Sequence, residues 1–496
     1  MQDNRYKKVY HGSKKWKGNL EMIFNSLTFL CVFLPVTYIL YCVIPSLKGK
    51  NVLLILASLF FYAYGEPVYV LLMIFSAVFN YGAARVIAHV TERKKLALLI
   101  TVFVNLTLLG YFKYAAFLID SVNRVLNLEI KVPETGLPVG ISFFTFQTVS
   151  YVIDVYYGRT EEQKSFWKVL LYICFFPQLI AGPIVKYRDI CEAIEDRNIQ
   201  WDYAAAGLQS FICGLSKKVL IANAMGVVAD SVFEAEHSQV NAMVAWIGAV
   251  AYLMQIYYDF SCYSDMAIGL GRMFGFRFRE NFEYPYGAGS VREFWRRWHI
   301  SLSAWFREYV YIPLGGNRRG RLRGAVNRMI VFFLTGLWHG ANWTFVLWGL
   351  YHGFLLLLEE YIPVMRKLPR WFAHVYTVVV VCVGFVMFRA DTIWQGLYYI
   401  GQMFIGFWQT KETISLAWQQ MTPYFIVMLV TAIVGCAPIK RLADWVRRET
   451  NDIEKLTSGW RSVLLGGLRT ITVCLLVWCM LRLSGGTYNP FIYFRF

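Results

Sequence analysis

One histidine of this chain, His339, lies in an apolar run, FFLTGLWHGANWTFVLWGL at residues 332–350, that holds no other ionisable side chain. A helix over this run is long enough to place His339 near the centre of a bilayer. An ionisable group at that depth is costly and usually faces a protein interior or a water-filled path, so it marks a functional site by default. In a dry, narrow cavity the imidazole could accept the proton of a hydroxyl whose oxygen attacks a thioester. The structural alternative is a neutral core histidine that a neighbouring helix satisfies.

A second group of candidates lies in SVREFWRRWHISLSAWFREYVYIPLGG, residues 290–316, where tryptophan alternates with arginine. Trp298, Arg296 and Arg297 form part of an anchoring belt if this segment lies at the membrane interface, because such belts mix aromatic and basic side chains. The arginines could instead hold the phosphates of a nucleotide-like thioester donor, or an acidic carrier protein, at the cytosolic mouth of a site. His299 closes the cluster and is less suited than Trp298 to be only an anchor.

Two acids, Asp259 and Asp265, fall in another apolar stretch, YLMQIYYDFSCYSDMAIGLG at residues 252–271. In apolar surroundings each must be paired, hydrogen-bonded or protonated. Their spacing puts them on different faces of a regular helix, which argues against a paired-carboxylate acid and base device. We expect Arg272 and Arg292 to be their counter-charges, and a structural role competes with a substrate-supporting one.

The residues after His339 offer it one candidate partner. Asn342 comes three residues later and can share its helix face, where it could orient the imidazole or bind an oxygen of the reacting group. His352 comes thirteen residues later, about 140° away around a regular helix, so the two histidines are not expected to converge. Kinks at Gly340 or Gly349 would weaken that argument.

Other chemistries find little support. The sequence contains no serine-nucleophile elbow, no zinc-protease motif, no phosphate-binding P-loop and no dinucleotide fingerprint. His299 and His339 lack nearby histidine or cysteine partners, and no two cysteines have C-x-x-C spacing, so we expect no metal. Acid and base chemistry by histidine is therefore the enzymatic hypothesis that the motifs favour.

The composition indicates what kind of protein positions these residues. Of 496 residues, 57% are hydrophobic, 18% aromatic and 16% charged, which excludes an ordinary soluble domain and a disordered chain. Apolar stretches of roughly twenty residues recur along the sequence, and only helices satisfy their own backbone in lipid. We therefore predict an all-α polytopic membrane protein with about ten to twelve transmembrane helices.

The net charge of +17 has a simple explanation in such a protein. Basic residues collect in cytosolic loops of membrane proteins, so the charge does not indicate nucleic-acid binding. Residues 291–328 contain nine arginines and two glutamates, which places this stretch in the cytosol. A multi-pass protein of the plasma or inner membrane follows, with the lipid bilayer as its surroundings.

The organisation along the chain is predicted as two parts. A basic N-terminal extension covers residues 1–22, and a single membrane-embedded domain covers residues 23–496. Within it, residues 199–236 are amphipathic, with two adjacent lysines among apolar residues, and are expected to lie along the membrane interface. Residues 252–315 are too charged to cross lipid simply and are expected to form short amphipathic pieces buried against the spans.

Several segments resemble the membrane-bound O-acyltransferase family, in the bacterial branch that contains the membrane subunit of alginate O-acetyltransferases. The resemblance extends from the first spans to the last residue of the sequence. It rests on LPVGISFFTFQTVSYVIDVYYG (137–158), FPQLIAGPIVKY (176–187), YYDFSCYSDMAIGLGRMFGF (257–276), FWRRWHISLSAWFREYVYIPLGGNRRG (294–320), TGLWHGANWTFVLWGLYHG (335–353) and NPFIYFRF (489–496). One departure is Cys262, which stands where this branch is expected to have glycine.

The resemblance implies which residues react. The histidine of the W-H-G element, His339, would be the essential catalytic residue, and that of the R-R-W-H element, His299, the second functional one. Trp338 of the W-H-G element joins the candidates that would bind or support substrate. The implied fold is a ring of tilted helices, with short interfacial helices, around a thin centre where funnels from both faces meet as a tunnel near His339.

The resemblance also implies substrates and partners. An acyl thioester donor, such as acetyl-CoA or an acyl carrier protein, would act without any permanently bound cofactor. The acceptor would be a hydroxyl of a polysaccharide or of a partner protein. Related systems pass the acetyl group to a separate extracytoplasmic protein that modifies the polymer, so we expect such a partner here. Acetylation in alginate biosynthesis and acetylation of cellulose, peptidoglycan or another exopolysaccharide are not separated by these motifs.

Three alternatives stay open. The branch that transfers D-alanine from a carrier protein to teichoic acid shares both histidine motifs but tends to be shorter. A proton-coupled transporter could use His339 and the intramembrane acids as a relay, although the sequence shows no internal repeat of the kind frequent in transporters. A non-catalytic assembly scaffold would make both histidines structural.

Overall fold

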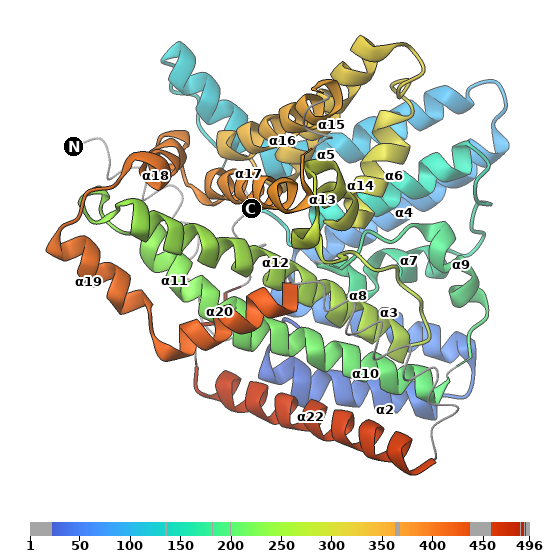
Figure 1. Ribbon diagram of the computed structural model, residues 1–496. Helices are drawn as coiled ribbons and strands as arrows, with labels where there is room; N and C mark the ends of the chain where they lie inside the picture. Colours follow the sequence, from blue (N-terminus) through green and yellow to red (C-terminus); the bar gives the residue numbers. More distant parts are fainter. Residues whose placement is uncertain are drawn as a thin grey trace. The chain divides into compact units, whose positions relative to one another are not determined.

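The structure is a computed structural model (Figure 1) and describes residues 22–133, 136–180, 182–198, 200–362, 368–436, 458–486, 488–490 and 492. Every regular element among these residues is a helix. The helices form two compact units, one of residues up to 180 with residues 185–198, the other of residues 181–184 with those from 199 onward. A compact unit need not be a domain, so the single domain predicted over residues 23–496 stays a prediction. The predicted extension falls, except for Met22, outside the described residues.

Long helices alternate with short ones in both units. The first unit contains η1 (Phe29–Phe33), α2 (Leu34–Val43), α3 (Leu47–Gly65), α4 (Tyr69–His89), α5 (Lys94–Leu126), α6 (Ile141–Tyr156), α7 (Phe166–Cys174), α8 (Phe176–Leu179) and α9 (Tyr187–Glu195). The second contains α10 (Trp201–Ser216), η2 (Lys217–Ala222), α11 (Asn223–Phe233), η3 (His237–Gln239), α12 (Ala242–Met273), η4 (Pro285–Gly287), α13 (Val291–Arg297), α14 (Ile300–Phe306), η5 (Arg307–Tyr311), α15 (Arg321–His339), α16 (Trp343–Tyr361), α17 (Arg370–Arg389), α18 (Ile393–Ile405), α19 (Lys411–Gln420), α20 (Pro423–Cys436) and α22 (Ser458–Ser484).

Five of the described helices are long and apolar enough to cross a membrane, or six if the bent pair α19 and α20 counts as one span. They are α3, α4, α5, the continuous helix Trp201–Phe233 and α17. The prediction of an all-α polytopic membrane protein is confirmed. The number of ten to twelve transmembrane helices stays a prediction.

Buried amides hold the first unit together. Asn80 of α4 donates to the side-chain oxygen of Asn105 of α5 at 3.0 Å, and Asn105 donates back at 2.9 Å. The Thr148 hydroxyl of α6 donates to the same Asn105 oxygen at 3.3 Å. Such side-chain hydrogen bonds join helices in lipid, where burial of apolar surface supplies little attraction between them.

The location of residues 199–236 along the membrane interface stays a prediction, while the segment contains a helix long and apolar enough to cross a membrane. α10, η2 and α11 form one continuous helix, and it packs along α12 (Figure 1). The approach is close, because a Cβ atom added to Gly207 would lie 2.6 Å from the carbonyl oxygen of Gly269. The segment looked amphipathic because it contains adjacent lysines, but both are neutralised inside the protein.

Two ion pairs provide this neutralisation. Lys217 Nζ lies 2.5 Å from Asp265 Oδ2, and Lys218 Nζ lies 2.5 Å from Asp259 Oδ1. The first pair is partly exposed, whereas the side chains of the second keep only 2% and 1% of their surface. Both acids come from α12, so the two pairs fix the register of the α10–η2–α11 helix against it.

The prediction of short pieces over residues 252–315 is correct only for its second half. Residues up to Met273 belong to α12, a helix of 32 residues, which its paired acids allow to stay among apolar neighbours. From residue 274 to residue 315 the chain forms loops and the short helices η4, α13, α14 and η5, as predicted.

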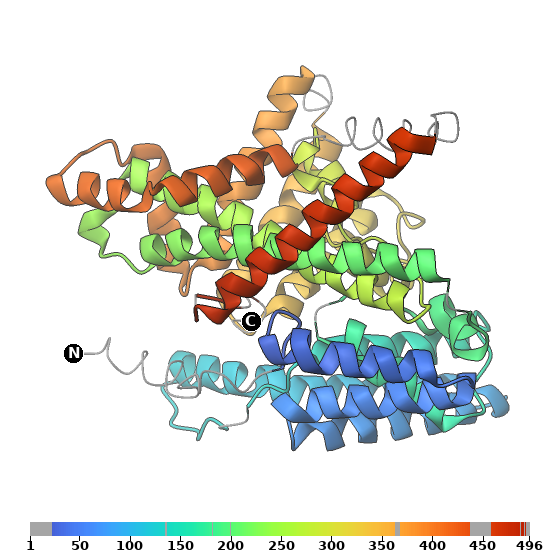
Figure 2. The ribbon, with the colours of Figure 1, turned by 90° about the horizontal axis from the view of Figure 1, so that it is seen from below.

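The residues after α22 add backbone hydrogen-bond partners to the buried pair of Lys218 and Asp259. We call Tyr488, Asn489, Pro490 and Ile492 the post-α22 segment. The Ile492 amide donates to Asp259 Oδ2 at 2.8 Å, and Lys218 Nζ donates to the carbonyl oxygen of Pro490. Figure 2 shows α22 crossing α10 on its way to this segment. The buried lysine and aspartate thus gain backbone partners as well as each other.

Lys218→Met should lower the free energy of unfolding by about 3–5 kcal/mol, because removing one partner leaves the other charge buried and uncompensated. The double variant Lys218→Met/Asp259→Asn should recover much of that loss, since it removes both charges and keeps an acceptor for the Ile492 amide. The melting temperature of the detergent-purified chain measures both effects. Arg124→Gln, which breaks the exposed pair with Asp120, is the control and should cost below about 1 kcal/mol. A Lys218→Met variant as stable as this control would contradict the argument.

Candidate active site

His339 lies at the end of a helix and not inside one. α15 ends at His339, Gly340 is extended with a φ of −174°, and Asn342 caps the start of α16. The apolar run over residues 332–350 therefore does not form a single helix. The break has local causes: a Cβ atom on Gly340 would lie 2.3 Å from the Phe345 ring, and asparagine is a favoured N-cap residue.

α15 and α16 form an antiparallel hairpin held by glycines, and Figure 1 shows the two helices side by side. A Cβ atom on Gly336 would lie 2.3 Å from the Phe345 carbonyl oxygen, and one on Gly349 would lie 2.3 Å from that of Phe332. Because the backbones touch at these points, the hairpin has one register. That register sets where His339 lies against α16.

Aromatic rings surround His339. Its imidazole centroid lies 5.0 Å from the ring of Trp338, 5.1 Å from that of Trp348 and 5.2 Å from that of Phe388. The last two contacts are nearly perpendicular, at 89° and 79°. These neighbours come from α15, α16 and α17, and His339 keeps 4% of its surface exposed. The imidazole therefore lies in dry surroundings fixed by three helices.

His299 reaches the same aromatic cluster. Its ring centroid lies 5.7 Å from that of Trp338, so one indole contacts both His299 and His339. The ring centroid of Phe282 lies 6.0 Å from that of His299, and His299 keeps 3% of its surface exposed. The structure thus brings together the two histidines that the motifs single out, although they are forty residues apart in sequence.

The backbone at His299 is unusual. Its φ of 45° and ψ of 56° place it in the left-handed region, which non-glycine residues seldom adopt. Asn281 holds this turn: its carbonyl accepts from the Ile300 amide at 2.9 Å, and its side chain accepts from the Ser301 amide at 3.0 Å. Strained residues persist where their surroundings fix them, often at functional sites. Sequence reasoning missed Asn281, because a lone asparagine between charged residues gives no periodic signal.

The prediction that His352 does not converge with His339 is wrong. It assumed one helix, whereas the two residues belong to different arms of the hairpin. The Trp348 ring lies 5.1 Å from that of His339 and 5.2 Å from that of His352. His352 is fully buried, and its Nε2 would lie 2.7 Å from a Cβ atom on Gly384. The four-residue spacing of Trp348 and His352 was the signal that could have placed both in the site.

Asn342 stabilises the turn between α15 and α16. Its side chain accepts from the Thr344 amide at 3.1 Å and donates to the Asp391 carbonyl at 3.0 Å. The helix face that it was predicted to share with His339 does not exist, because α15 has ended. Its role toward substrate stays a prediction.

Asp259 and Asp265 are held by lysines, so the prediction of Arg272 and Arg292 as their counter-charges is wrong. Each arginine pairs with a glutamate instead. The sequence of α12 alone does not reveal this arrangement, because Lys218 lies 41 residues before Asp259 and Lys217 lies 48 residues before Asp265. The acids have a clear structural role in joining α10, η2 and α12, and a substrate-supporting role stays a prediction.

The members of the tryptophan and arginine cluster differ in how exposed they are: Trp298 is buried, Arg297 is half-buried and Arg296 is exposed. Trp298 keeps 2% of its surface and packs on Phe294 at 5.4 Å, so the interpretation as an interface anchor is wrong for this residue. Arg297 bonds to Glu293 four residues earlier. Arg296 is exposed and forms no ion pair with any residue that the structure describes. Of the two arginines, Arg296 is the one with an open guanidinium for an anionic ligand.

Burial also settles the charge of His299, which lies between two helices too short to cross a membrane. Loss of water lowers the pKa of His299 to about 3. The imidazole is therefore neutral at physiological pH and a weak base. A neutral imidazole can donate or accept a hydrogen bond. Within the described part of the chain, no three His, Cys, Asp or Glu side chains are grouped to hold a metal ion.

Acid should destabilise the protein through His299. Because its folded pKa of about 3 lies below the unfolded value of ~6.5, the unfolded chain binds the proton first as pH falls. About 1.4 kcal/mol of stability is then lost for each pH unit below 6.5. His299→Gln should therefore lose less melting temperature between pH 7 and pH 5 than the unchanged protein. The exposed His89→Gln should behave like the unchanged protein, and equal pH dependence in all three would contradict the assignment.

Comparison with known proteins gives this site a context. A sequence model of the membrane-bound O-acyltransferase family, MBOAT, matches residues 159–390, which contain His299, His339 and His352. The chain is 39% identical to the probable alginate O-acetylase AlgI of Pseudomonas putida, over 96% of this chain and 100% of that protein.

Two further relatives differ in their acceptors and acyl groups by name. The peptidoglycan O-acetyltransferase of Helicobacter pylori is 38% identical over 75% of this chain and 78% of its own length. The teichoic acid D-alanyltransferase of Bacillus subtilis is 29% identical over 50% of this chain and 68% of its own length.

Proposed function

Because the chain belongs to the membrane-bound O-acyltransferase family and is an O-acyltransferase, we propose that it transfers an acetyl group from a cytosolic thioester to a hydroxyl outside the membrane. The acceptor hydroxyl belongs to an extracellular polysaccharide or to a partner protein that modifies the polymer. The donor is acetyl-CoA or an acyl carrier protein. The protein resides in the plasma or inner membrane.

The observation that carries this proposal is the pairing of His339 and His299 around Trp338 in dry, aromatic surroundings. His339 acts as the general base. The acceptor oxygen forms a bond to the acetyl carbonyl carbon while its proton passes to the imidazole. The bond from carbon to sulfur then breaks, and the departing thiolate takes that proton to leave as a thiol.

His299 and Arg296 have supporting roles in this scheme. A neutral His299 can donate a hydrogen bond to the acetyl carbonyl oxygen, on which negative charge grows as the hydroxyl attacks. The exposed Arg296 offers a guanidinium to the phosphates of a nucleotide-like donor.

Substrates reach His339 by movement of the aromatic side chains around it. With 4% of its surface exposed, the imidazole does not meet solvent freely in the described arrangement. Trp338 and Phe388 cover it from different helices, and rotation of such rings opens the centre to donor or acceptor. The central tunnel implied by the resemblance stays a prediction.

The choice of acetyl rests on relatives. Two of them carry O-acetylation in their names, and the chain aligns with the full length of the relative from Pseudomonas putida. Transfer of D-alanine to teichoic acid is the second candidate, because a D-alanyltransferase is also similar over half of this chain. Which polysaccharide accepts the group is decided by the partner protein in this proposal.

His339→Ala should lower polymer-bound acetyl by at least about a hundredfold in cells, because a general base contributes on the order of 10²–10⁴ to a rate. Acetyl esters on secreted polymers, quantified by mass spectrometry after mild alkaline release, provide the measurement. Membrane amounts and gel-filtration profiles must match the unchanged protein. His89→Ala replaces an exposed histidine of α4 and should retain full acetylation. Undiminished acetylation in a folded His339→Ala protein would favour the scaffold alternative.

Membranes that contain the chain should incorporate label from radiolabelled acetyl-CoA into polymer. D-alanine charged on a carrier protein should give at most a few per cent of that incorporation, and His339→Ala membranes should give none with either donor. Efficient D-alanyl incorporation with no acetyl incorporation would replace the first candidate by the second. Solute flux through purified protein without any donor would favour the transporter alternative.

A further inference from the structure

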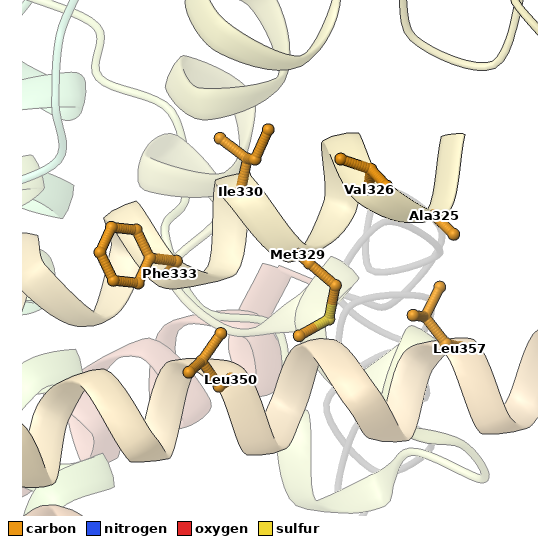
Figure 3. Close-up of a pocket in the computed structure, with 7 residues that line it drawn as sticks. All are labelled: Ala325, Val326, Met329, Ile330, Phe333, Leu350 and Leu357. Carbon is orange, nitrogen blue, oxygen red and sulfur yellow. The ribbon is translucent and has the colours of Figure 1, made fainter. Parts of the chain in front are cut away.

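A groove runs along the α15–α16 hairpin, and none of the histidines of the candidate site lines it. It encloses about 400 Å³, is open along one side, and has no polar residue in its lining. Figure 3 shows Met329 of α15 pointing toward α16, from which Leu350 and Leu357 point back. The lining consists of Ala325, Val326, Met329, Ile330, Phe333, Leu350 and Leu357.

Exposed apolar side chains extend this groove along both helices. Leu347 and Phe354 lie one turn to either side of Leu350 on α16 and are 37% and 56% exposed. Leu322 lies one turn before Val326 on α15 and is 80% exposed. A contiguous exposed apolar surface of this kind marks contact with lipid or with a partner.

Positive charge stands at one end of the groove. Arg321 lies one helical turn before Ala325, and Arg323 lies three residues before Val326, so the two arginines flank the groove on opposite sides at the start of α15. Helical side chains lean toward the N-terminus, which directs both guanidinium groups beyond the end of the apolar lining. Four arginines around the start of α15 are exposed, and none of the four forms an ion pair with the residues that the structure describes. These four are Arg318, Arg319, Arg321 and Arg323.

The two helices are joined at this basic end. The Tyr361 hydroxyl, at the end of α16, donates to the carbonyl oxygen of Arg321 at 3.1 Å. The bond links the start of α15 to the end of α16. The basic start of α15 is therefore tied to the end of α16, next to the apolar lining that the two helices share.

We propose that this surface binds an anionic phospholipid, with one acyl chain in the groove and the headgroup phosphate against Arg321 and Arg323. A free phosphate would use the arginines and leave the groove empty. A neutral lipid would use the groove and leave the arginines without a partner. An amphiphile with an anionic head uses both, which is the reason for choosing it among occupants.

The test uses the full chain, purified in detergent and stripped of lipid. Binding of dioleoylphosphatidylglycerol, dioleoylphosphatidylcholine and glycerol phosphate is followed by native mass spectrometry. We expect phosphatidylglycerol to bind at least about tenfold more tightly than phosphatidylcholine. Arg321→Gln/Arg323→Gln should weaken phosphatidylglycerol about 25-fold, since each arginine near an anionic headgroup strengthens binding roughly fivefold. Its affinity for phosphatidylcholine should fall less, because the choline ammonium of that lipid offsets the charge of its phosphate.

Two further variants locate the site. Leu350→Trp fills the groove and should weaken both lipids alike, whereas Arg93→Gln/Lys95→Gln removes the same charge from exposed positions of the first unit and should change neither. Both arginine positions are exposed, so loss of binding there is not loss of folding.

Three results would overturn the proposal. One is equal binding of the two lipids by the unchanged protein. Another is undiminished phosphatidylglycerol binding by Arg321→Gln/Arg323→Gln. The third is displacement of phosphatidylglycerol by glycerol phosphate at equal concentration, which would make the site one for a free anion.

Discussion

A charge buried among apolar helices must meet an opposite charge, and in the second unit this requirement decides which parts of the chain lie together. Lys218 can leave water only beside Asp259, so the helix that carries it must lie along α12. Small residues allow the approach, since Gly207 and Gly269 have nearly touching backbones. The ion pair thus decides that the α10–η2–α11 helix lies along α12, and the glycines allow the two backbones to come close. The candidate site is built on the helices that follow α12 in the chain.

The site itself depends on a helix that stops. If α15 continued past His339, the imidazole would face one neighbour only, and His352 would point elsewhere. Because Gly340 ends the helix, α16 folds back and brings Trp348 against both histidines. Short helices then carry His299 to the other side of Trp338. One hairpin and one strained turn hence bring the candidate histidines to the same aromatic cluster.

Sequence reasoning predicted the class of protein better than the surroundings of the candidate residues. The class of protein followed from hydropathy, and the choice of His299 and His339 as candidates followed from motifs that the resemblance supplied. The angle between His339 and His352 was wrong because helical geometry was extended through Gly340. The partners of Asp259 and Asp265 were wrong because ion pairs between helices leave no trace in local spacing. Asn281 gave no signal, since its work is to hold a backbone turn that only the fold creates.

The post-α22 segment has a consequence for the order in which the protein matures. Lys218 and the Pro490 carbonyl that binds it are separated by 272 residues. At ~5–20 residues per second, a ribosome needs roughly 15 to 50 s to make the intervening chain. During that time Lys218 and Asp259 are already synthesised, but the backbone groups that complete their surroundings are not. A nascent chain therefore holds an incompletely hydrogen-bonded ion pair until synthesis reaches the post-α22 segment.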